Sequence, residues 1–311
     1  MDQESNERID MESENTLIAS SEAGFLLTAG DLEIFKLIYE FRFLQMDHLV
    51  ALTGRSAKRL DRRLLKLRRA GYLTTLRKLP HKYIYALARG AVCELVEQGS
   101  VDESVLADRL RAHELKDLFL KHEMLIVDLH VMLSLASRTG DLRLIDWREG
   151  RSLYDSVSVP DREGLVKLPI RPDAFFTLED SRRPSGANRA HFFLEADRST
   201  SSQARFTEKI RAYWHYLEQG LHAKKFKIKN FRTLTVTLTH ERAENLCALA
   251  ASIVPERTRK YYLFTSLKNF SLDNVAPILE TVYLSPRSIG TDVRHPLVPP
   301  PTPTQIQSAV L

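Results

Sequence analysis

Hydrophobic and polar positions in the first third of the chain follow two different periods. From about residue 29, apolar side chains recur every three or four residues, which is typical of one face of a helix. After residue 71 they alternate with polar side chains, which favours strands. The predicted elements are helices at 31–41, 45–52, 56–70 and 90–98 and strands at 72–76 and 83–87. We therefore expect a helical domain that carries a β-hairpin.

The third of these helices is far more basic than its neighbours. Its predicted core stripe is Ala57, Leu60, Leu64 and Leu67, and most positions outside the stripe are lysine or arginine. The predicted elements follow the order of a winged helix-turn-helix: a helix, a short helix, a glycine-containing turn, a basic helix and a basic hairpin. In that motif the third helix enters the major groove. The alternative is a solvated basic face on an ordinary helical hairpin. The residues expected to bind DNA are Arg55, Lys58, Arg59, Arg62, Arg63 and Lys66 at this helix and Arg77, Lys78 and Lys82 at the hairpin tip.

A long helix is predicted for residues 113–137. Its apolar residues follow a three-four spacing, which favours core packing or the seam of a homodimer over a chemical role. His122 lies inside this stripe and is expected to be a hydrogen-bonded core histidine rather than a metal ligand. Glu123 and Asp128 lie off the stripe, so either could lean toward the acidic residues of the next domain.

Beyond residue 140, short strands and helices alternate along the chain, which indicates an α/β layer structure around a mixed sheet. Six prolines after residue 285 oppose regular structure. The predicted organisation is an acidic disordered leader at 1–28, a winged helix-turn-helix domain at 29–100, an α/β domain at 104–285 and a Pro-rich flexible tail at 286–311.

Charge is distributed unevenly over the chain. The net charge is +5, yet residues 1–24 hold seven acids and one base, which is −6, so the remainder carries 5 − (−6) = +11. A basic body favours a polyanionic partner. The longest apolar run is too short to span a membrane and no signal peptide is visible. Cys93 and Cys247 lie far apart, which suits a reducing, cytoplasmic setting.

Candidate chemistry is concentrated between residues 171 and 200. Glu195 and Asp197 stand two apart on one predicted strand, so their side chains point the same way, and Asp173 opens another strand. Clustered carboxylates repel one another unless a cation lies between them, and oxygen ligands suit Mg²⁺. Asp173, Glu195 and Asp197 are therefore the candidate metal ligands, with Mg²⁺ as the candidate cofactor.

Five short runs of sequence carry a family resemblance: residues 122–128, 144–148, 171–173, 193–200 and 209–213. Together they resemble the replication-relaxation family over about residues 30–285. That resemblance implies a winged helix followed by an α/β domain, and a place on plasmids or other mobile elements. Because the family is similar to the PD-(D/E)XK nuclease fold, it also implies Asp173 and Glu195 as an acidic pair.

The sequence departs from the nuclease pattern two residues after the acid. Where those nucleases carry lysine, this chain has Asp197, which places negative charge where negative charge would develop on a phosphate. Lys209 on the following helix could compensate. Alternatively Asp197 is an extra metal ligand, or Asp197 pairs with Arg171 or Arg198 as a structural salt bridge. The catalytic set of an active site would be Asp173, Glu195, Asp197 and Lys209.

Three functions fit this pattern. The first is a double-stranded DNA-binding protein of plasmid or mobile-element type, which regulates transcription or assists replication or mobilisation, with a catalytically degenerate nuclease-like domain. The second is a Mg²⁺-dependent DNA endonuclease targeted by the winged helix. The third is an interaction module that recruits a relaxase or a replication protein.

Overall fold

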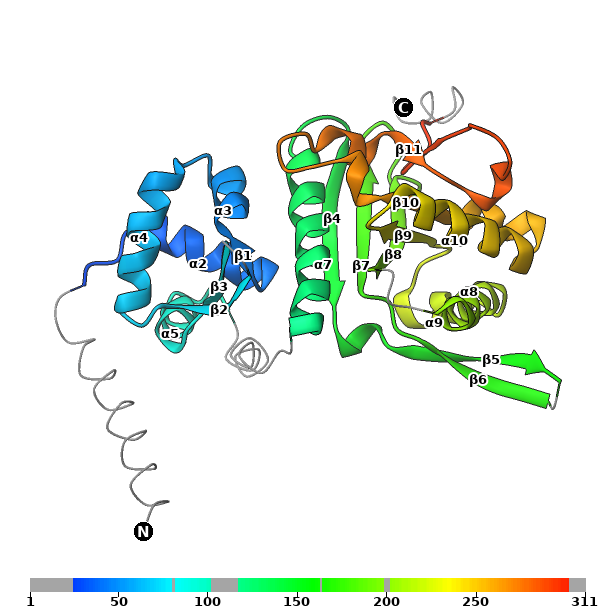
Figure 1. Cartoon of the computed structure of the whole chain (residues 1–311), viewed down its shortest axis with the longest axis horizontal. Coiled ribbons are helices and arrows are strands. Elements are labelled where there is room, and N and C mark those ends of the chain that lie inside the picture. Colours follow the sequence, from blue (N-terminus) through cyan, green and yellow to red (C-terminus); the bar gives the residue numbers. More distant parts are fainter. Residues whose placement is uncertain (1–24, 80–81, 102–116, 163, 199–201, 302–311) are drawn as a thin grey trace, which may run out of the picture. The chain divides into compact units, whose positions relative to one another are not determined.

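The structure, a computed structural model, describes residues 25–79, 82–101, 117–162, 164–198 and 202–301 (Figure 1). Contacts divide the chain into two compact units, unit 1 (Met1–Val131) and unit 2 (Met132–Leu311). The division falls within helix α7 (Asp117–Ala136). The domain boundary predicted at 100–104 adjoins residues 102–116, which lie outside the described ranges.

Unit 1 combines helices with a small antiparallel sheet. Its strands are ordered β1-β3-β2, and β3 pairs antiparallel with both neighbours. The helices lie close to their predicted bounds. The elements are α2 (Ala29–Phe41), β1 (Leu44–Gln45), α3 (Met46–Thr53), α4 (Ala57–Arg69), β2 (Leu73–Leu79), β3 (Lys82–Leu87) and α5 (Arg89–Glu97).

The turn between α3 and α4 follows from its residues. Gly54 ends α3 in the left-handed conformation, φ 67°, which glycine adopts without steric cost, and its N–H donates to the carbonyl of Val50. Ser56 is the N-cap of α4. Leu60, Leu64 and Leu67 are buried as predicted, but Ala57 is exposed, because the first turn of α4 extends beyond the core.

The first part of α7 belongs to unit 1 and is tied to it by charge. Glu123 pairs with Arg42 at 2.6 Å, and Asp128 accepts from His48 Nε2 at 2.9 Å. The ring of His130 lies 4.3 Å from that of Phe41, centroid to centroid. The two acids predicted to lie off the apolar stripe are thus engaged by bases of unit 1.

Unit 2 is built on a mixed sheet, as predicted, and this sheet has five strands. The strands are ordered β10-β9-β8-β7-β4; β8, β9 and β10 run parallel, while β7 is antiparallel to β8 and to β4. The elements are β4 (Leu142–Glu149), β7 (Ala174–Asp180), β8 (Arg189–Asp197), α8 (Gln203–Glu218), β9 (Arg232–Thr237), α10 (His240–Ile253), β10 (Tyr262–Ser266) and β11 (Thr281–Tyr283).

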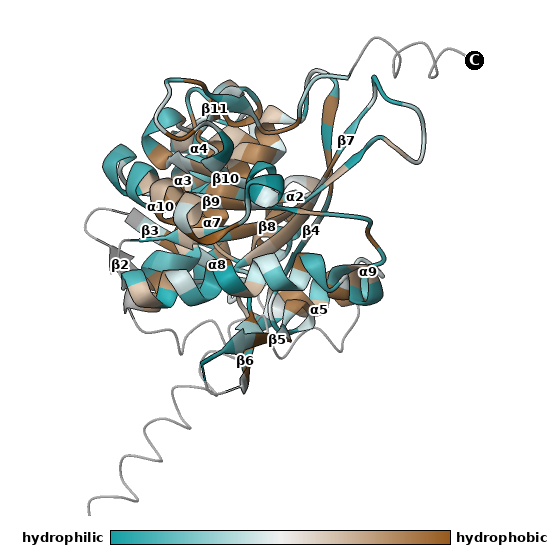
Figure 2. Cartoon of the chain, turned by 90° about the vertical axis from the view of Figure 1, so that its right-hand side faces the viewer, coloured by the Kyte–Doolittle hydropathy of each residue, from teal (hydrophilic) through white to brown (hydrophobic). Residues whose placement is uncertain are grey.

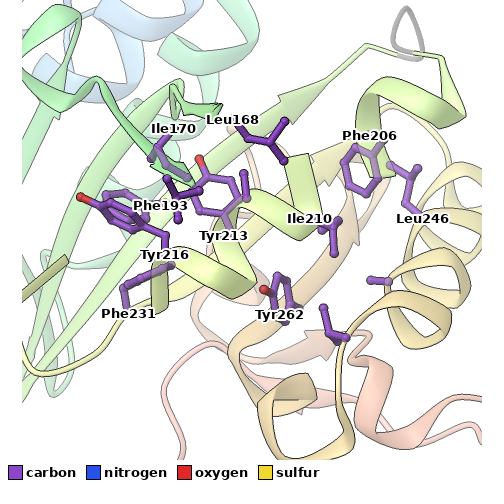
Figure 3. Packing of buried hydrophobic residues seen from close by; sticks show 14 of the residues in the cluster. Leu168, Ile170, Phe193, Phe206, Ile210, Tyr213, Tyr216, Phe231, Leu246 and Tyr262 are labelled. Atoms are coloured by element: carbon purple, nitrogen blue, oxygen red, sulfur yellow. The ribbon is translucent and has the colours of Figure 1, made fainter. Parts of the chain in front are cut away.

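One hydrophobic core of unit 2 lies between this sheet and helices α8 and α10 (Figure 3). Phe193 of β8 packs with Tyr213 of α8 and Phe231, at ring-centroid distances of 5.8 and 4.6 Å, and Leu246 of α10 belongs to the same cluster. Burying one such side chain stabilises the fold by about 1.5–3 kcal/mol. In Figure 2 the central strands are mostly brown, whereas α8 alternates between brown and teal, as a helix with one buried face does.

Two elements of unit 2 differ from the sequence prediction. The sequence pattern predicts one short strand at 152–158, but β5 (Asp155–Asp161) and β6 (Gly164–Ile170) form an antiparallel hairpin that extends away from the main sheet (Figure 1). The basic run from Lys224 to Lys229 suits either phosphate contact or a solvated strand edge by its sequence; in the structure its first part is the end of α9 (Leu221–Phe226). Periodicity is a weak guide to elements this short.

The predicted flexible tail is wrong for residues 286–301. A short helix, Pro286–Ser288, is followed by β12 (His295–Pro296), which pairs with β11. Leu297 is fully buried and Val298 is 7% exposed. Proline opposes helices and central strands but fits edge strands and turns, so the composition did not exclude this packing. The rest of the predicted tail, residues 302–311, and the predicted leader up to residue 24 lie outside the described residues.

None of the helices in the described parts of the chain combines the length and the hydrophobicity that crossing a membrane requires.

Candidate functional site

The exposed face of α4 is a basic stripe. Lys58, Arg62, Lys66 and Arg69 are exposed and recur at steps of four, four and three residues, which places them on one side of the helix. The buried leucines occupy the opposite side. Arg59 is exposed beside this stripe, and none of these five cations forms an ion pair within the described ranges. We call these five residues the α4 basic face.

Two residues expected to bind DNA are instead tied into the fold of unit 1. Arg55 pairs with Glu33 and donates to the carbonyl of Gly30 at 3.0 Å. Arg63 pairs with Asp31, which is 1% exposed. Burial raises the pKa of Asp31, but hydrogen bonds from Arg63 and Thr28 outweigh it and hold that pKa below its usual value.

Asp31 also organises the start of α2. It accepts from the backbone N–H of Thr28, the N-cap residue, at 2.7 Å. The guanidinium of Arg63 additionally lies 4.6 Å from the ring centroid of Phe25. Arg63 therefore anchors α4 to the beginning of α2, a structural task that the basic composition of α4 did not reveal.

The hairpin tip lies at the limit of what the structure describes. Arg77 and Lys78 belong to β2 and Lys82 begins β3, but their side chains, like residues 80–81, lie outside the described part of the chain. Nearer the base of the hairpin, Arg68 of α4 lies 5.3 Å from the ring centroid of Tyr83. This interaction links α4 to the hairpin.

Strand register brings Asp173 and Glu195 together in unit 2. Ala174 of β7 pairs with Leu194 of β8, so the next positions outward, Asp173 and Glu195, lie opposite one another. The carboxylate of Asp173 accepts the backbone N–H of Ala196 at 2.8 Å. The predicted proximity of these two acids thus follows from the pairing of their strands.

Helix α8 covers the Glu195 carboxylate. Lys209 and Tyr213 are one turn apart on α8, and both donate to Glu195, which is 2% exposed. Burial raises the pKa of Glu195 to about 7; Lys209 opposes this shift and Asp173 adds to it. Burial also lowers the pKa of Lys209, but the charges of Glu195 and Asp173 outweigh it, so the pKa of Lys209 is raised.

Asp197 has a partner that the sequence did not suggest. Its carboxylate accepts from Arg242 Nε at 2.7 Å, near the start of α10. Of the two arginines considered from the sequence, Arg171 lies 5.6 Å from the ring centroid of Tyr154. Nothing in the local pattern around Arg242 marks it as this partner, because 45 residues separate it from Asp197.

Two of the three candidate metal ligands are engaged by other side chains. One oxygen of Glu195 accepts from Lys209 and the other from Tyr213, while Asp197 is held by Arg242. Among the residues that the structure describes, no three His, Cys, Asp or Glu are grouped so that they could hold a metal ion. The cluster is instead an acidic pair, Asp173 and Glu195, closed by a lysine and a tyrosine.

Residues 35–230 match the model of one protein family, described as Replication-relaxation. The matched range includes both α4 and the Asp173–Glu195 pair. Comparison with curated proteins and with solved structures found no match.

Proposed function

The chain belongs to the replication-relaxation family, and from this premise we propose that it is a double-stranded DNA-binding protein that reads its site through unit 1. The family description suggests a replication-related role. In this proposal unit 1 is a winged helix-turn-helix, α4 is its recognition helix and the β2–β3 hairpin is its wing. The protein then acts in transcription control, replication or mobilisation of a plasmid or other mobile element.

The observation that carries the proposal is the α4 basic face. One side of this helix is buried leucine, and the other presents exposed cations that form no ion pair with the described residues. Such a helix is suited to the major groove, where phosphates flank the base edges. Arg59 and Arg62 can each offer two parallel N–H donors to guanine, whereas Lys58 and Lys66 are suited to phosphate. The structural tasks of Arg55 and Arg63 remove them from the proposed DNA-binding set.

Unit 2 is proposed to act as a scaffold with a degenerate nuclease-like site. Hydrolysis of a phosphodiester needs a lysine free to stabilise the developing charge, and here Lys209 is bound to Glu195. Both oxygens of Glu195 already accept a hydrogen bond from α8, so the carboxylate has partners without a divalent ion. The proposal therefore assigns no catalysis to this cluster.

The test replaces Arg59 and Arg62 together with alanine and measures binding to duplex DNA that flanks the gene. Without two bidentate arginines, specific binding should weaken by about 100-fold or more. The melting temperature should stay nearly unchanged, because both side chains are exposed. The matched control is Lys36→Ala with Arg89→Ala, which removes two exposed charges of unit 1 outside α4. Equal affinity of the wild type and the Arg59/Arg62 variant would refute the recognition helix.

A metal-dependent endonuclease is the second candidate, because Asp173, Glu195 and Lys209 lie together as an active site of that kind requires. Plasmid incubated with the protein and Mg²⁺ should remain uncut under the first proposal. Nicking by the wild type that disappears in both Asp173→Ala and Glu195→Ala would favour the endonuclease.

A further inference from the structure

A second charged site lies in unit 2, at the end of the sheet where β8, β9 and β10 begin. There a cavity of about 440 Å³ is bordered by Arg189, Arg232 and Tyr261, which stand at or just before the first residues of the three strands. The segment 298–300 forms another wall. Glu195 and Asp197 lie toward the opposite end of β8, so the cavity is separate from the acid cluster.

The lining of this cavity is positively charged. Arg183, Arg189, Arg232 and Lys260 border it, and no acid is among the residues that line it. Arg183 is balanced by Asp180 at 3.1 Å, and Arg189 by Glu179 at 3.4 Å. For Arg232 and Lys260 there is no ion pair with a carboxylate in the described ranges, so two cations remain without an anion.

The side chain of Arg232 is fixed by a hydrogen bond but has no carboxylate partner among the described residues. Its guanidinium donates to the carbonyl of Leu297 at 2.7 Å, which fixes one side of the fork. Burial lowers the pKa of Arg232, and the nearby charges of Arg183 and Arg287 lower it further. A half-buried cation surrounded by cations destabilises the empty site, and a bound anion would offset that cost.

We infer that this cavity binds a phosphate monoester carried by a ligand of about nucleotide size. The two cations that have no carboxylate partner among the described residues match the charge of about −1.5 to −2 that such a group carries near pH 7. The volume falls within the range of about 300–1,000 Å³ that is usual for small-ligand sites. Asn188, Asn230 and Tyr261 add uncharged hydrogen-bonding groups for the remainder of the ligand. The inference is independent of DNA binding by unit 1.

His191 at the edge of the cavity does not add to this charge. Burial, and then the nearby charge of Arg189, hold its pKa below the usual value, so the imidazole is neutral at pH 7. Its Nδ1 lies 3.0 Å from the hydroxyl of Thr177. The positive charge that binds the ligand therefore comes from Arg232 and Lys260. The affinity of the cavity for the ligand should change little between pH 7 and pH 8.

The experiment titrates the full chain with inorganic phosphate, with adenosine 5′-monophosphate, and with a short single-stranded oligonucleotide bearing either a 5′-phosphate or a 5′-hydroxyl. Calorimetry gives the affinities. Lys260→Gln should weaken binding of the phosphate monoesters by about tenfold, because glutamine cannot replace a charge-assisted hydrogen bond. Arg232→Gln should have a similar or larger effect, and Arg232→Lys should recover only part of it, because lysine lacks the planar fork.

The matched controls are Lys268→Gln and Arg162→Gln, which remove exposed charges of unit 2 outside the cavity. They should bind as the wild type does. Lys260 is itself exposed, so its variant should fold even if Arg232→Gln does not. Tighter binding of the monophosphate identifies a nucleotide ligand, and tighter binding of the 5′-phosphorylated strand identifies a nucleic-acid end. The inference would be overturned if neither phosphate, nor adenosine 5′-monophosphate, nor the 5′-phosphorylated strand bound more tightly than the 5′-hydroxyl strand, or if the control variants lost as much affinity as Lys260→Gln.

Discussion

The α4 basic face and the Asp173–Glu195 pair are both densely charged, but they hold their charges differently. The five cations of the α4 basic face are exposed and have no acid partner in the described ranges. In unit 2 Glu195 is 2% exposed and accepts from both Lys209 and Tyr213. Exposed charges stay hydrated and contribute little to folding, so they are available to a partner. Buried charges must be satisfied by partners within the fold, and Lys209 and Tyr213 are those partners for Glu195.

The pH dependence of stability should show this difference most strongly. The pKa of Glu195 is raised to about 7, so between about pH 4.5 and pH 7 the folded protein binds a proton that the unfolded chain has released. Stability from this group is therefore present at low pH and is lost as the pH rises, by up to about 3 kcal/mol. Urea unfolding at pH 5 and pH 8 should show that loss in the wild type relative to Glu195→Gln, which cannot ionise. If the free energy of unfolding changed with pH in the same way in the wild type and in Glu195→Gln, the predicted contribution of Glu195 would be contradicted.

Replacing Glu195 with alanine should destabilise the fold at pH 6 by about 1–3 kcal/mol, because Lys209 and Tyr213 lose their acceptor. Denaturant midpoints with and without Mg²⁺ measure the effect. If Glu195 has a structural role only, Mg²⁺ should leave the denaturant midpoints of the wild type and of Glu195→Ala unchanged. Greater stability of the variant, together with a Mg²⁺-dependent rise in melting temperature that only the wild type shows, would indicate a metal site.

Removing the partner of Asp197 should have a similar or smaller effect. Arg242→Ala leaves a buried carboxylate without its salt bridge, and we expect a loss of about 1–2 kcal/mol. Arg242 is 21% exposed, so water can reach part of the site and limit the cost. The control is Arg62→Ala on the α4 basic face, which should leave the unfolding free energy within about 0.5 kcal/mol of the wild type. Equal destabilisation by the two variants would remove the distinction between the regions.

The smallest expected effect concerns single lysines of α4. Lys58→Ala or Lys66→Ala should reduce the slope of log affinity against log salt concentration by about 0.9 for each phosphate that the variant no longer neutralises. Anisotropy titrations at several salt concentrations measure that slope. Lys36→Ala on α2 is the control and should leave it unchanged. If Lys36→Ala reduced the slope and neither Lys58→Ala nor Lys66→Ala did, the DNA would bind to a surface other than the α4 basic face.

The sequence alone predicted those features of the fold that depend on interactions between residues close together along the chain. The bounds of α2, α3 and α4, the buried leucines of α4 and its basic opposite face all follow from residues within a few turns of one another. The adjacency of Asp173 and Glu195 was also predictable, because both stand at the ends of strands of apolar residues. Strands and hairpins with mixed polarity, such as β5 and β6, gave a weaker signal.

Only the tertiary structure decided which charges remain free. Composition cannot distinguish Arg63, bound to Asp31 across 32 positions, from Arg62 beside it, which stays exposed. Arg242 reaches Asp197, and Arg232 meets the 297–300 segment, only because strand order and helix packing bring distant positions together. The physical reason is that an ion pair or a cavity depends on distances set by the whole fold, whereas helical and strand periodicity depends on neighbours along the chain.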